Sequence, residues 1–338
     1  MISKKHFGEI PNIGSVTLYK ILAQNGAYVE LLDFGATLQA MVVPDKNGNF
    51  ADIVQGFDDL EGHLNHSDFQ GKTVGRYANR IGGGGFFIDG KITPLPADEN
   101  GVFLHSGGEF SDALWRGETV GEDAVKFTHT SDGKGFGYSG TVAAAVLYRF
   151  DGRALTIDYT AAVSASTVLN FTNHTYWNLR GEGTILEHIL EIEGDFFQPV
   201  DELMLPNAQP ENVTDTPFDF RQAKPIGRDI NADDPQLKIA RGYDHHFYLN
   251  KNGAVKVTEP ETGRILTMTT DKPGFQLYTG NFLSGAKGKS GVPLGVNTGF
   301  CLESQFPPNT PNSPNLAQCM FSPREEYRSR TVYEVGCL

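Results

Sequence analysis

Short apolar segments closed by turns recur along the whole chain. Apolar and polar residues alternate within many of them, as in half-buried strands, and hairpin dipeptides such as Asn25-Gly26, Asp89-Gly90 and Asp151-Gly152 follow several. The predicted strands are Ser15–Leu22, Tyr28–Phe34, Thr37–Val43, Phe86–Ile88, Ala124–His129, Gly140–Phe150, Ala154–Val163, Thr167–Trp177, Ile185–Ile192, His246–Leu249, Ala254–Glu259, Ile265–Thr270, Phe275–Thr279, Gly299–Gln305 and Arg330–Val335.

Helical periodicity is confined to short pieces, for instance Asp58–Asn65 and Asp219–Ala223. The pattern argues against βαβ units and predicts an all-β fold, a large antiparallel β-sandwich with few short helices. No internal repeat or low-complexity linker divides the chain, so we expect a single domain over residues 1–338. Gln198–Asp244 is the least regular stretch, and loops of that length are often functional.

Composition and charge limit the partners. The 39 Gly and 18 Pro suit a chain of many turns, and the net charge of −13 argues against nucleic acid, whose phosphates need clustered Lys and Arg. No run reaches the roughly 18 apolar residues of a membrane span, and no apolar signal-peptide core follows the first lysines. The three cysteines, Cys301, Cys319 and Cys337, form no disulfide framework and predict reduced thiols in a cytoplasmic protein.

A run of four glycines, Gly82 to Gly85, invites comparison with phosphate-binding loops. Such a loop needs a buried strand before it and a helix after it. Here Asn79-Arg80-Ile81 precedes the run and a hairpin signal, Phe86 to Gly90, follows it. The flanks therefore predict a hairpin and argue against a nucleotide site.

One predicted strand presents a polar face. Side chains alternate along a strand, so Asn170, Thr172, His174, Tyr176 and Asn178 share one side. Such a face is either solvated or lines a cleft where hydrogen-bonding groups converge on a polar ligand. Taken alone, a single histidine on a strand is more often structural than catalytic, so the role of His174 is left open at this point.

A second apolar strand carries a carboxylate. Phe300, Leu302, Ser304 and Phe306 share one face, which leaves Cys301, Glu303 and Gln305 on the other. Burying a carboxylate displaces its pKa, which makes Glu303 a candidate base. An exposed glutamate on an edge strand is the equal alternative.

Gly242 to Phe247 contributes Asp244 and two adjacent imidazoles. Because neighbouring strand residues point in opposite directions, His245 and His246 are poorly placed to bind one metal ion. A metal site from His105, His174, His245 and His246 lacks support from any metal-binding spacing. We therefore expect no metal.

Two polar loops add hydrogen-bond donors. Gly75 to Ile81 sets Asn79 beside Arg80, and Asn100 to Gly108 holds His105 between glycines. Both suit sugar hydroxyls, although either alone is also an ordinary surface turn.

Together and in this order, the segments GRYANRI, LHSGG, TNHTYWNL, TPFDFR, GYDHHF, GFQLYTGNF and LESQFPPNTPNSP resemble the aldose 1-epimerases, or galactose mutarotases. They run from Gly75 to Pro314, so the resemblance covers nearly the whole chain. It implies the family's galactose mutarotase-like supersandwich, a large antiparallel β-sandwich, and agrees with the fold that the pattern predicts. LHSGG departs mildly from the commoner Leu-His-Gly-Gly form.

The resemblance also implies an activity: interconversion of the α and β anomers of free hexoses such as galactose and glucose. It makes His174 the general acid and Glu303 the general base, and it implies neither cofactor nor metal. The sugar-binding residues that it implies are Asn79, Arg80, His105, Asp244 and Gln276. We expect Asp244 to favour a protonated His174 and local donors to keep Glu303 ionised.

Three rival functions remain. A hexose-6-phosphate 1-epimerase would need an arginine cluster, for which Arg76 and Arg80 are the only obvious pair. A glycosidase would use Asp244 and Glu303 but leaves His174 without a role. A non-catalytic carbohydrate-binding protein is the third. The partner expected in every case is a small sugar, and the chain is expected to be a monomer or a homodimer.

Overall fold

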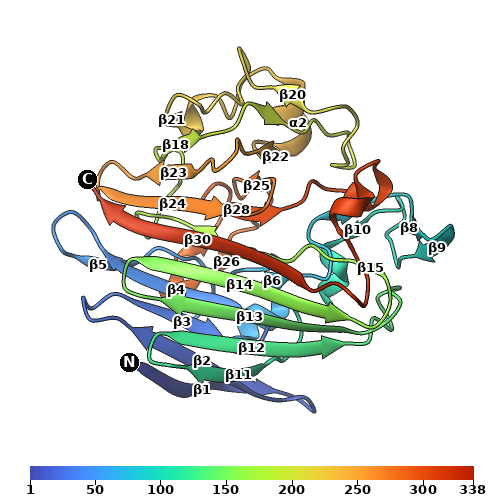
Figure 1. Cartoon of the computed structure of the whole chain (residues 1–338). Helices are drawn as coiled ribbons and strands as arrows, with labels where there is room; N and C mark the ends of the chain where they lie inside the picture. The colour runs from blue at the N-terminus through green and yellow to red at the C-terminus, as the bar shows by residue number, and fades with distance from the viewer.

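The computed structural model describes residues 1–338 and consists mainly of three antiparallel sheets (Figure 1). The largest sheet has nine strands, with the C-terminal strand near its middle. Its strands in spatial order are β11 (Arg116–Val120), β12 (Ala124–Ser131), β13 (Val142–Phe150), β14 (Ala154–Val163), β30 (Tyr327–Cys337), β24 (Arg264–Thr270), β23 (Val255–Thr258), β18 (Ile189–Ile192) and β21 (Lys224–Pro225).

The other two sheets have five and six strands. The five-stranded sheet keeps the order of the sequence: β1 (Ile2–Ile10), β2 (Gly14–Leu22), β3 (Tyr28–Leu32), β4 (Thr37–Pro44) and β5 (Phe50–Asp52). The six-stranded sheet has the order β17 (Tyr176–Trp177), β28 (Phe300–Gln305), β25 (Gly274–Tyr278), β22 (Asp244–Tyr248), β19 (Phe196–Phe197) and β20 (Glu211–Asn212).

One cluster of 51 buried residues joins the three sheets. Alternation supplies it: along β14, Leu155, Ile157 and Tyr159 point into the core, whereas Thr156 and Asp158 lie on the half-exposed outer face. The cluster also takes apolar residues from β2, β3 and β4 and from β25 and β28. Sheets that share one core through their inner faces form a sandwich, so the predicted all-β, antiparallel fold is confirmed.

Five short two-stranded ladders complete the strands. They are β6 (Thr73–Val74) with β16 (Thr172–Asn173), β7 (Arg80–Ile81) with β10 (Phe103–Leu104), β8 (Gly85–Ile88) with β9 (Lys91–Pro94), β15 (Thr167–Val168) with β29 (Met320–Phe321), and β26 (Ala286–Lys287) with β27 (Pro293–Leu294). The β8–β9 pair is the hairpin predicted after the four glycines, with Asp89 and Gly90 at its turn. The prediction there is confirmed.

Helices are few and short: α1 (Leu60–Asn65), α2 (Pro235–Ala240) and the 3₁₀ turns η1 (His105–Gly108), η2 (Ile226–Arg228), η3 (Lys289–Gly291), η4 (Thr310–Asn312) and η5 (Leu316–Gln318). No helix of the structure is long and apolar enough to cross a bilayer. The first predicted helix is confirmed by α1, whose first turn is capped by the carboxylate of Asp59. Sequence reasoning missed α2, although Asp234 caps it and Pro235 occupies its first turn.

The helix predicted at Asp219–Ala223 is wrong, because that segment is irregular, with a bend at Arg221 and Gln222. Phe218 and Phe220 are both buried in the core, and a spacing of two residues suits an extended chain. The carboxylate of Asp219 accepts a hydrogen bond from the backbone N–H of Arg221, at 3.2 Å, and from its guanidinium. These local bonds hold a bend in place of a helix.

The strand predicted at Thr167–Trp177 is broken into three. β15, β16 and β17 pair with three different partners, β29, β6 and β28, so the backbone bends twice within eleven residues of sequence. Both sides of the segment are buried, including Asn173 and Thr175 as well as His174 and Tyr176. His174 lies in the bend between β16 and β17.

Candidate active site

A small pocket of about 150 Å³ lies over the six-stranded sheet, on the face turned away from the main core. Strands β17, β22, β25 and β28 form its floor through Tyr176, Asp244, Tyr278 and Glu303, and loops form its walls. It is lined by Ser67, Asp68, Phe69, Asn79, Arg80, Leu104, His105, His174, Tyr176, Asp244, Tyr278, Phe282 and Glu303. Six of the seven predicted site residues therefore meet here.

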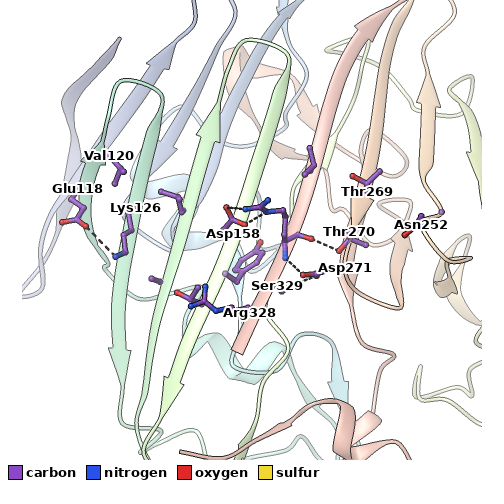
Figure 2. A pocket seen from close by; sticks show the side chains of 17 residues that line it. Glu118, Val120, Lys126, Asp158, Asn252, Thr269, Thr270, Asp271, Arg328 and Ser329 are labelled. Carbon is purple, nitrogen blue, oxygen red and sulfur yellow. Dashed lines mark hydrogen bonds and ion pairs between the residues drawn. The ribbon is translucent and has the colours of Figure 1, made fainter. Parts of the chain in front are cut away.

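The largest surface hollow, of about 1160 Å³, lies elsewhere, on the outer face of the nine-stranded sheet. Figure 2 shows its side chains, which pair with one another across neighbouring strands. Glu118 lies 4.0 Å from Lys126, and Asp158 binds Arg330 at 2.6 Å. None of the predicted site residues lines this hollow, so we place the candidate chemistry in the smaller pocket.

The register of the six-stranded sheet brings the acidic residues together. Glu303 on β28 is directly opposite Gln276 on β25, and β22 lies on the other side of β25. The side-chain amide of Gln276 donates a hydrogen bond to Asp244 at 2.7 Å. Gln276 does not line the pocket itself; it lies behind Asp244 and beside Glu303.

The predicted alternation along β28 is confirmed. Phe300 and Leu302 belong to the core, whereas Cys301 and Glu303 face the opposite side. Glu303 is only 2% exposed, so it is not a glutamate on a solvated edge. Oε2 of Glu303 has no hydrogen-bond partner among the protein atoms.

The imidazole of His174 lies next to this carboxylate, with Nε2 3.7 Å from Oε1 of Glu303. On its other side, Nδ1 lies 3.5 Å from the sulfur of Cys301. The backbone fixes the histidine as well, since its N–H donates to Lys72 O and its carbonyl accepts from the N–H of Gly71. The alternative that His174 is only a packed core residue is weakened by a buried carboxylate beside its ring.

The pKa values contradict the expected electrostatics. Burial lowers the pKa of His174 to about 4, and Asp244 does not offset this effect. Burial also raises the pKa of Glu303 well above its ordinary value; Asp244 raises it further and Arg80 lowers it. Asp244 therefore acts on Glu303 and not on His174, because a second negative charge nearby disfavours the ionised form of a buried carboxylate.

Two loops carry the remaining predicted residues. The backbone N–H of Asn79 donates to Nδ1 of His105 at 3.1 Å, and the N–H of His105 returns a bond to Asn79 O. His105 and Ser106 both have positive φ, a backbone conformation that is uncommon outside glycine and carries some strain. Arg80 extends from β7 to lie 3.8 Å from Oδ2 of Asp244.

Potential metal ligands do converge here, but they are not the four histidines that the sequence analysis considered and set aside. The ligand atoms of His105, His174 and Glu303 lie within 4.8 Å of one another. His245 instead packs against Phe197 and Phe218 in the core, because it points the opposite way from Asp244 on β22. In His105, Nδ1 accepts a backbone hydrogen bond, so the proton of the neutral ring is on Nε2 and that nitrogen cannot ligate a metal. The geometry thus favours His105 as a hydrogen-bond donor to a sugar hydroxyl.

Sequence reasoning did not assign the other seven lining residues to the site: Ser67, Asp68, Phe69, Leu104, Tyr176, Tyr278 and Phe282. The tyrosines had a signal, because Tyr176 follows His174 by two residues and Tyr278 follows Gln276 by two. Asp68 and Phe69 had none, since they belong to a polar loop after α1. The ring of Phe69 lies 4.7 Å from that of His105 and 5.8 Å from that of His174.

Comparison with known proteins shows the family to which the chain belongs. The family model described as aldose 1-epimerase matches residues 17–334. The chain belongs to the aldose 1-epimerase family. It is 36% identical to the galactose mutarotase of Bos taurus over 98% of both chains, and 36% identical to the aldose 1-epimerase of Escherichia coli over 91% of this chain and 92% of that one.

Solved structures give the same result. A GalM/aldose epimerase homologue from C. elegans superposes with a TM-score of 0.86 at 31% identity, over 95% of this chain and 99% of that one. A galactose 1-epimerase from Lactobacillus acidophilus has a TM-score of 0.89 at 27% identity, over 100% and 99%. The fold that the resemblance implied is therefore confirmed for this aldose 1-epimerase family member.

Proposed function

We propose that this protein interconverts the α and β anomers of free aldoses, hexoses such as galactose and glucose, with His174 as general acid and Glu303 as general base. The observation that carries the proposal is the 3.7 Å separation of Nε2 and Oε1 inside a pocket of about 150 Å³. An acid and a base this close can flank a single anomeric carbon. The names of its relatives, galactose mutarotase and aldose 1-epimerase, support the same activity.

The reaction is a balanced exchange of two protons. Glu303 takes the proton of the C1 hydroxyl while His174 gives its Nε2 proton to the ring oxygen; the bond from C1 to the ring oxygen breaks and an aldehyde forms. Rotation about C1–C2 presents the other carbonyl face, and the reverse transfers close the ring. Each transfer contributes about 10² to 10⁴-fold acceleration. Every proton has a donor and an acceptor in these two side chains, so the scheme calls for no cofactor.

The directions of the two pKa shifts fit this cycle. A neutral imidazole beside a carboxylic acid holds as many protons as an imidazolium beside a carboxylate, so the pair titrates as one unit. The ionic arrangement opens the ring, and ring opening leaves the neutral one. Because burial lowers the pKa of His174 and raises that of Glu303, it favours the neutral arrangement that faces the open-chain aldehyde.

We assign sugar binding to Asn79, Arg80, His105 and Asp244, and to Gln276 the role of holding Asp244, since Gln276 does not line the pocket. His105 would donate from Nε2–H, because its Nδ1 is taken by the backbone of Asn79. Asp244 would accept from hydroxyls, while Gln276 holds its other oxygen. Arg80 supplies charged donors at the same wall.

Only one of the two arginines that a hexose-6-phosphate epimerase would need, Arg80, lines the pocket. Arg76 is fully buried and binds Glu109 through Nε and Nη2, the shortest contact being 2.6 Å. It does not line the pocket, so Arg80 would face a phosphate dianion alone beside Asp244 and Glu303. One arginine does not make the cluster that a phosphate dianion needs.

Polarimetry on freshly dissolved α-D-galactose and α-D-glucose tests the proposal. The wild type is expected to accelerate the optical change over buffer, and His174→Asn and Glu303→Gln are each expected to lose about 10²-fold or more in kcat, since each removes one proton transfer. His188→Asn is a matched control, because His188 is equally buried but lies outside the pocket.

Three outcomes would contradict the proposal. Sugar binding by the wild type without acceleration would make it a carbohydrate-binding protein. Acceleration that survives in His174→Asn or Glu303→Gln would refute the assigned roles. Cleavage of an aryl glycoside that survives His174→Asn would indicate a glycosidase.

We also propose a cytoplasmic location, supported by three unpaired thiols, of which Cys301 and Cys319 are buried and Cys337 is exposed. A monomer or a homodimer remains the predicted assembly.

A further inference from the structure

Two side chains of one strand bracket the catalytic imidazole. Cys301 and Glu303 are two residues apart on β28 and therefore project from the same face. Nδ1 of His174 lies 3.5 Å from the sulfur of Cys301, and Nε2 lies 3.7 Å from Oε1 of Glu303. The opposing residue Tyr176 on β17 is paired directly with Cys301, which fixes this register.

The sulfur is the hydrogen-bond partner that the structure gives to Nδ1. The hydrogen bond at one ring nitrogen decides which nitrogen carries the proton in a neutral imidazole. Once His174 has given its Nε2 proton to the ring oxygen, the remaining proton is on Nδ1. Nε2 must then be free to take the proton back when the ring closes. The cycle thus requires an acceptor at Nδ1 in both of its states.

We propose that Cys301 is a positioning residue whose sulfur accepts the Nδ1–H of His174, so that Nε2 remains the nitrogen that exchanges the proton with the ring oxygen. This inference rests on the proposed function. In Ser-His-Asp triads a buried carboxylate orients the imidazole in the same way.

A thiol differs from a carboxylate in charge. Burial raises the pKa of Cys301 well above its ordinary value, and Glu303 and Asp244 raise it further, so the sulfur stays neutral. A neutral, weak acceptor orients the ring without stabilising the imidazolium as an anion would. His174 therefore remains acidic enough to protonate a ring oxygen, a weak base. Cys301 is fully buried, so its sulfur is out of contact with bulk water.

The first measurement is the tautomer of His174, read from ¹⁵N shifts of histidine-labelled protein at neutral pH and assigned with His174→Asn. The wild type is expected to show a protonated Nδ1 and an unprotonated Nε2. Cys301→Ala is expected to shift the population towards Nε2–H. Cys301→Ser, whose hydroxyl oxygen also accepts, is expected to restore the wild-type tautomer.

The second measurement separates kcat from KM by polarimetry. Loss of one hydrogen bond in Cys301→Ala is expected to lower kcat by about two- to tenfold with KM within about twofold, and Cys301→Ser is expected to recover most of kcat. Cys319→Ala is the matched control, because Cys319 is an equally buried thiol that binds Leu316 O and does not line the pocket. It should change neither readout.

An unprotonated Nδ1 in the wild type overturns the proposal even if no variant folds. An unchanged tautomer in Cys301→Ala also overturns it. So does a change in KM as large as the change in kcat that Cys301→Ser does not reverse. If the wild type does not accelerate mutarotation, the proposed function fails, while the ¹⁵N spectrum still decides whether Cys301 orients the ring.

Discussion

At the scale of single residues, two neighbours act on Glu303 in opposite directions. Asp244 raises the pKa of Glu303, and Arg80 lowers it. A general base works only when ionised, so activity falls as the pH drops through its pKa. Asp244→Asn should therefore lower the pKa of Glu303 and move the acid limb of the kcat/KM profile to lower pH, whereas Arg80→Gln should move it to higher pH.

The asparagine keeps an oxygen that can accept from Gln276, so the packing around Glu303 is preserved. Both variants are also expected to raise KM, by about tenfold, because each removes a charged hydrogen-bonding group from the sugar site. The profiles are measured by polarimetry across pH at low sugar concentration. Acid limbs that move in the same direction, or not at all, would refute Glu303 as the base.

The site residues were predictable from sequence to the extent that alternation and motif spacing carried them. Alternation put Cys301 and Glu303 on one face of β28, and the motifs named Asn79, Arg80 and His105. The sign of the pKa shifts was not predictable. Whether Asp244 acts on His174 or on Glu303 depends on distances across β22, β25 and β28, which the sequence of one strand does not contain.

At the scale of elements, the accuracy of the predictions depended on where each strand finds its partner. In β13, β14 and β28 side chains alternate between the two faces of an unbroken strand, and the predicted ranges are close to the observed ones. Thr167–Trp177 alternates equally well but pairs successively with β29, β6 and β28, which come from both ends of the chain. Pairing of that kind is a tertiary effect, and it creates the bend that holds His174.

The 3₁₀ turn η1 gives a prediction at this scale. Gly108 has a φ of 89°, and a Cβ there would collide with the carboxylate of Asp112, which is held by Lys72 at 2.7 Å. Gly83 also has a positive φ, 69°, but a Cβ there meets nothing within 4 Å. Gly108→Ala should thus displace η1 and His105, while Gly83→Ala should cost only backbone strain.

We expect Gly83→Ala to lower the free energy of unfolding by about 1 kcal/mol and to leave KM unchanged. Gly108→Ala should lower it by about 2 kcal/mol or more and raise KM several-fold, about the cost of one sugar contact. Denaturant unfolding and polarimetry measure the two quantities. Equal effects of both variants on KM would show that the collision with Asp112 does not position His105.

At the scale of the whole molecule, the two larger sheets each combine strands that lie far apart in the sequence. β30, the last strand, lies between β14 and β24, and the six-stranded sheet combines strands that begin as early as Tyr176 and as late as Phe300. The five-stranded sheet of the N-terminus shares its apolar face with the same core of 51 residues. Because the three sheets share one core, the stability of each depends on the others. We propose that residues 1–338 unfold as a single domain.

The two tryptophans provide the test. Trp115 precedes β11 of the nine-stranded sheet, and Trp177 lies in β17 of the six-stranded sheet. Both are buried and belong to the same core cluster. In Trp115→Phe only Trp177 reports, and in Trp177→Phe only Trp115 reports. If the domain is one cooperative unit, fluorescence and far-ultraviolet circular dichroism should give the same denaturation midpoint within each variant, because every probe then follows one transition.

A phenylalanine in either position shifts the midpoint of that variant by its own packing cost, so the comparison is made between probes and not between variants. Fluorescence that changes before the circular dichroism in one variant and after it in the other would divide the chain into two units.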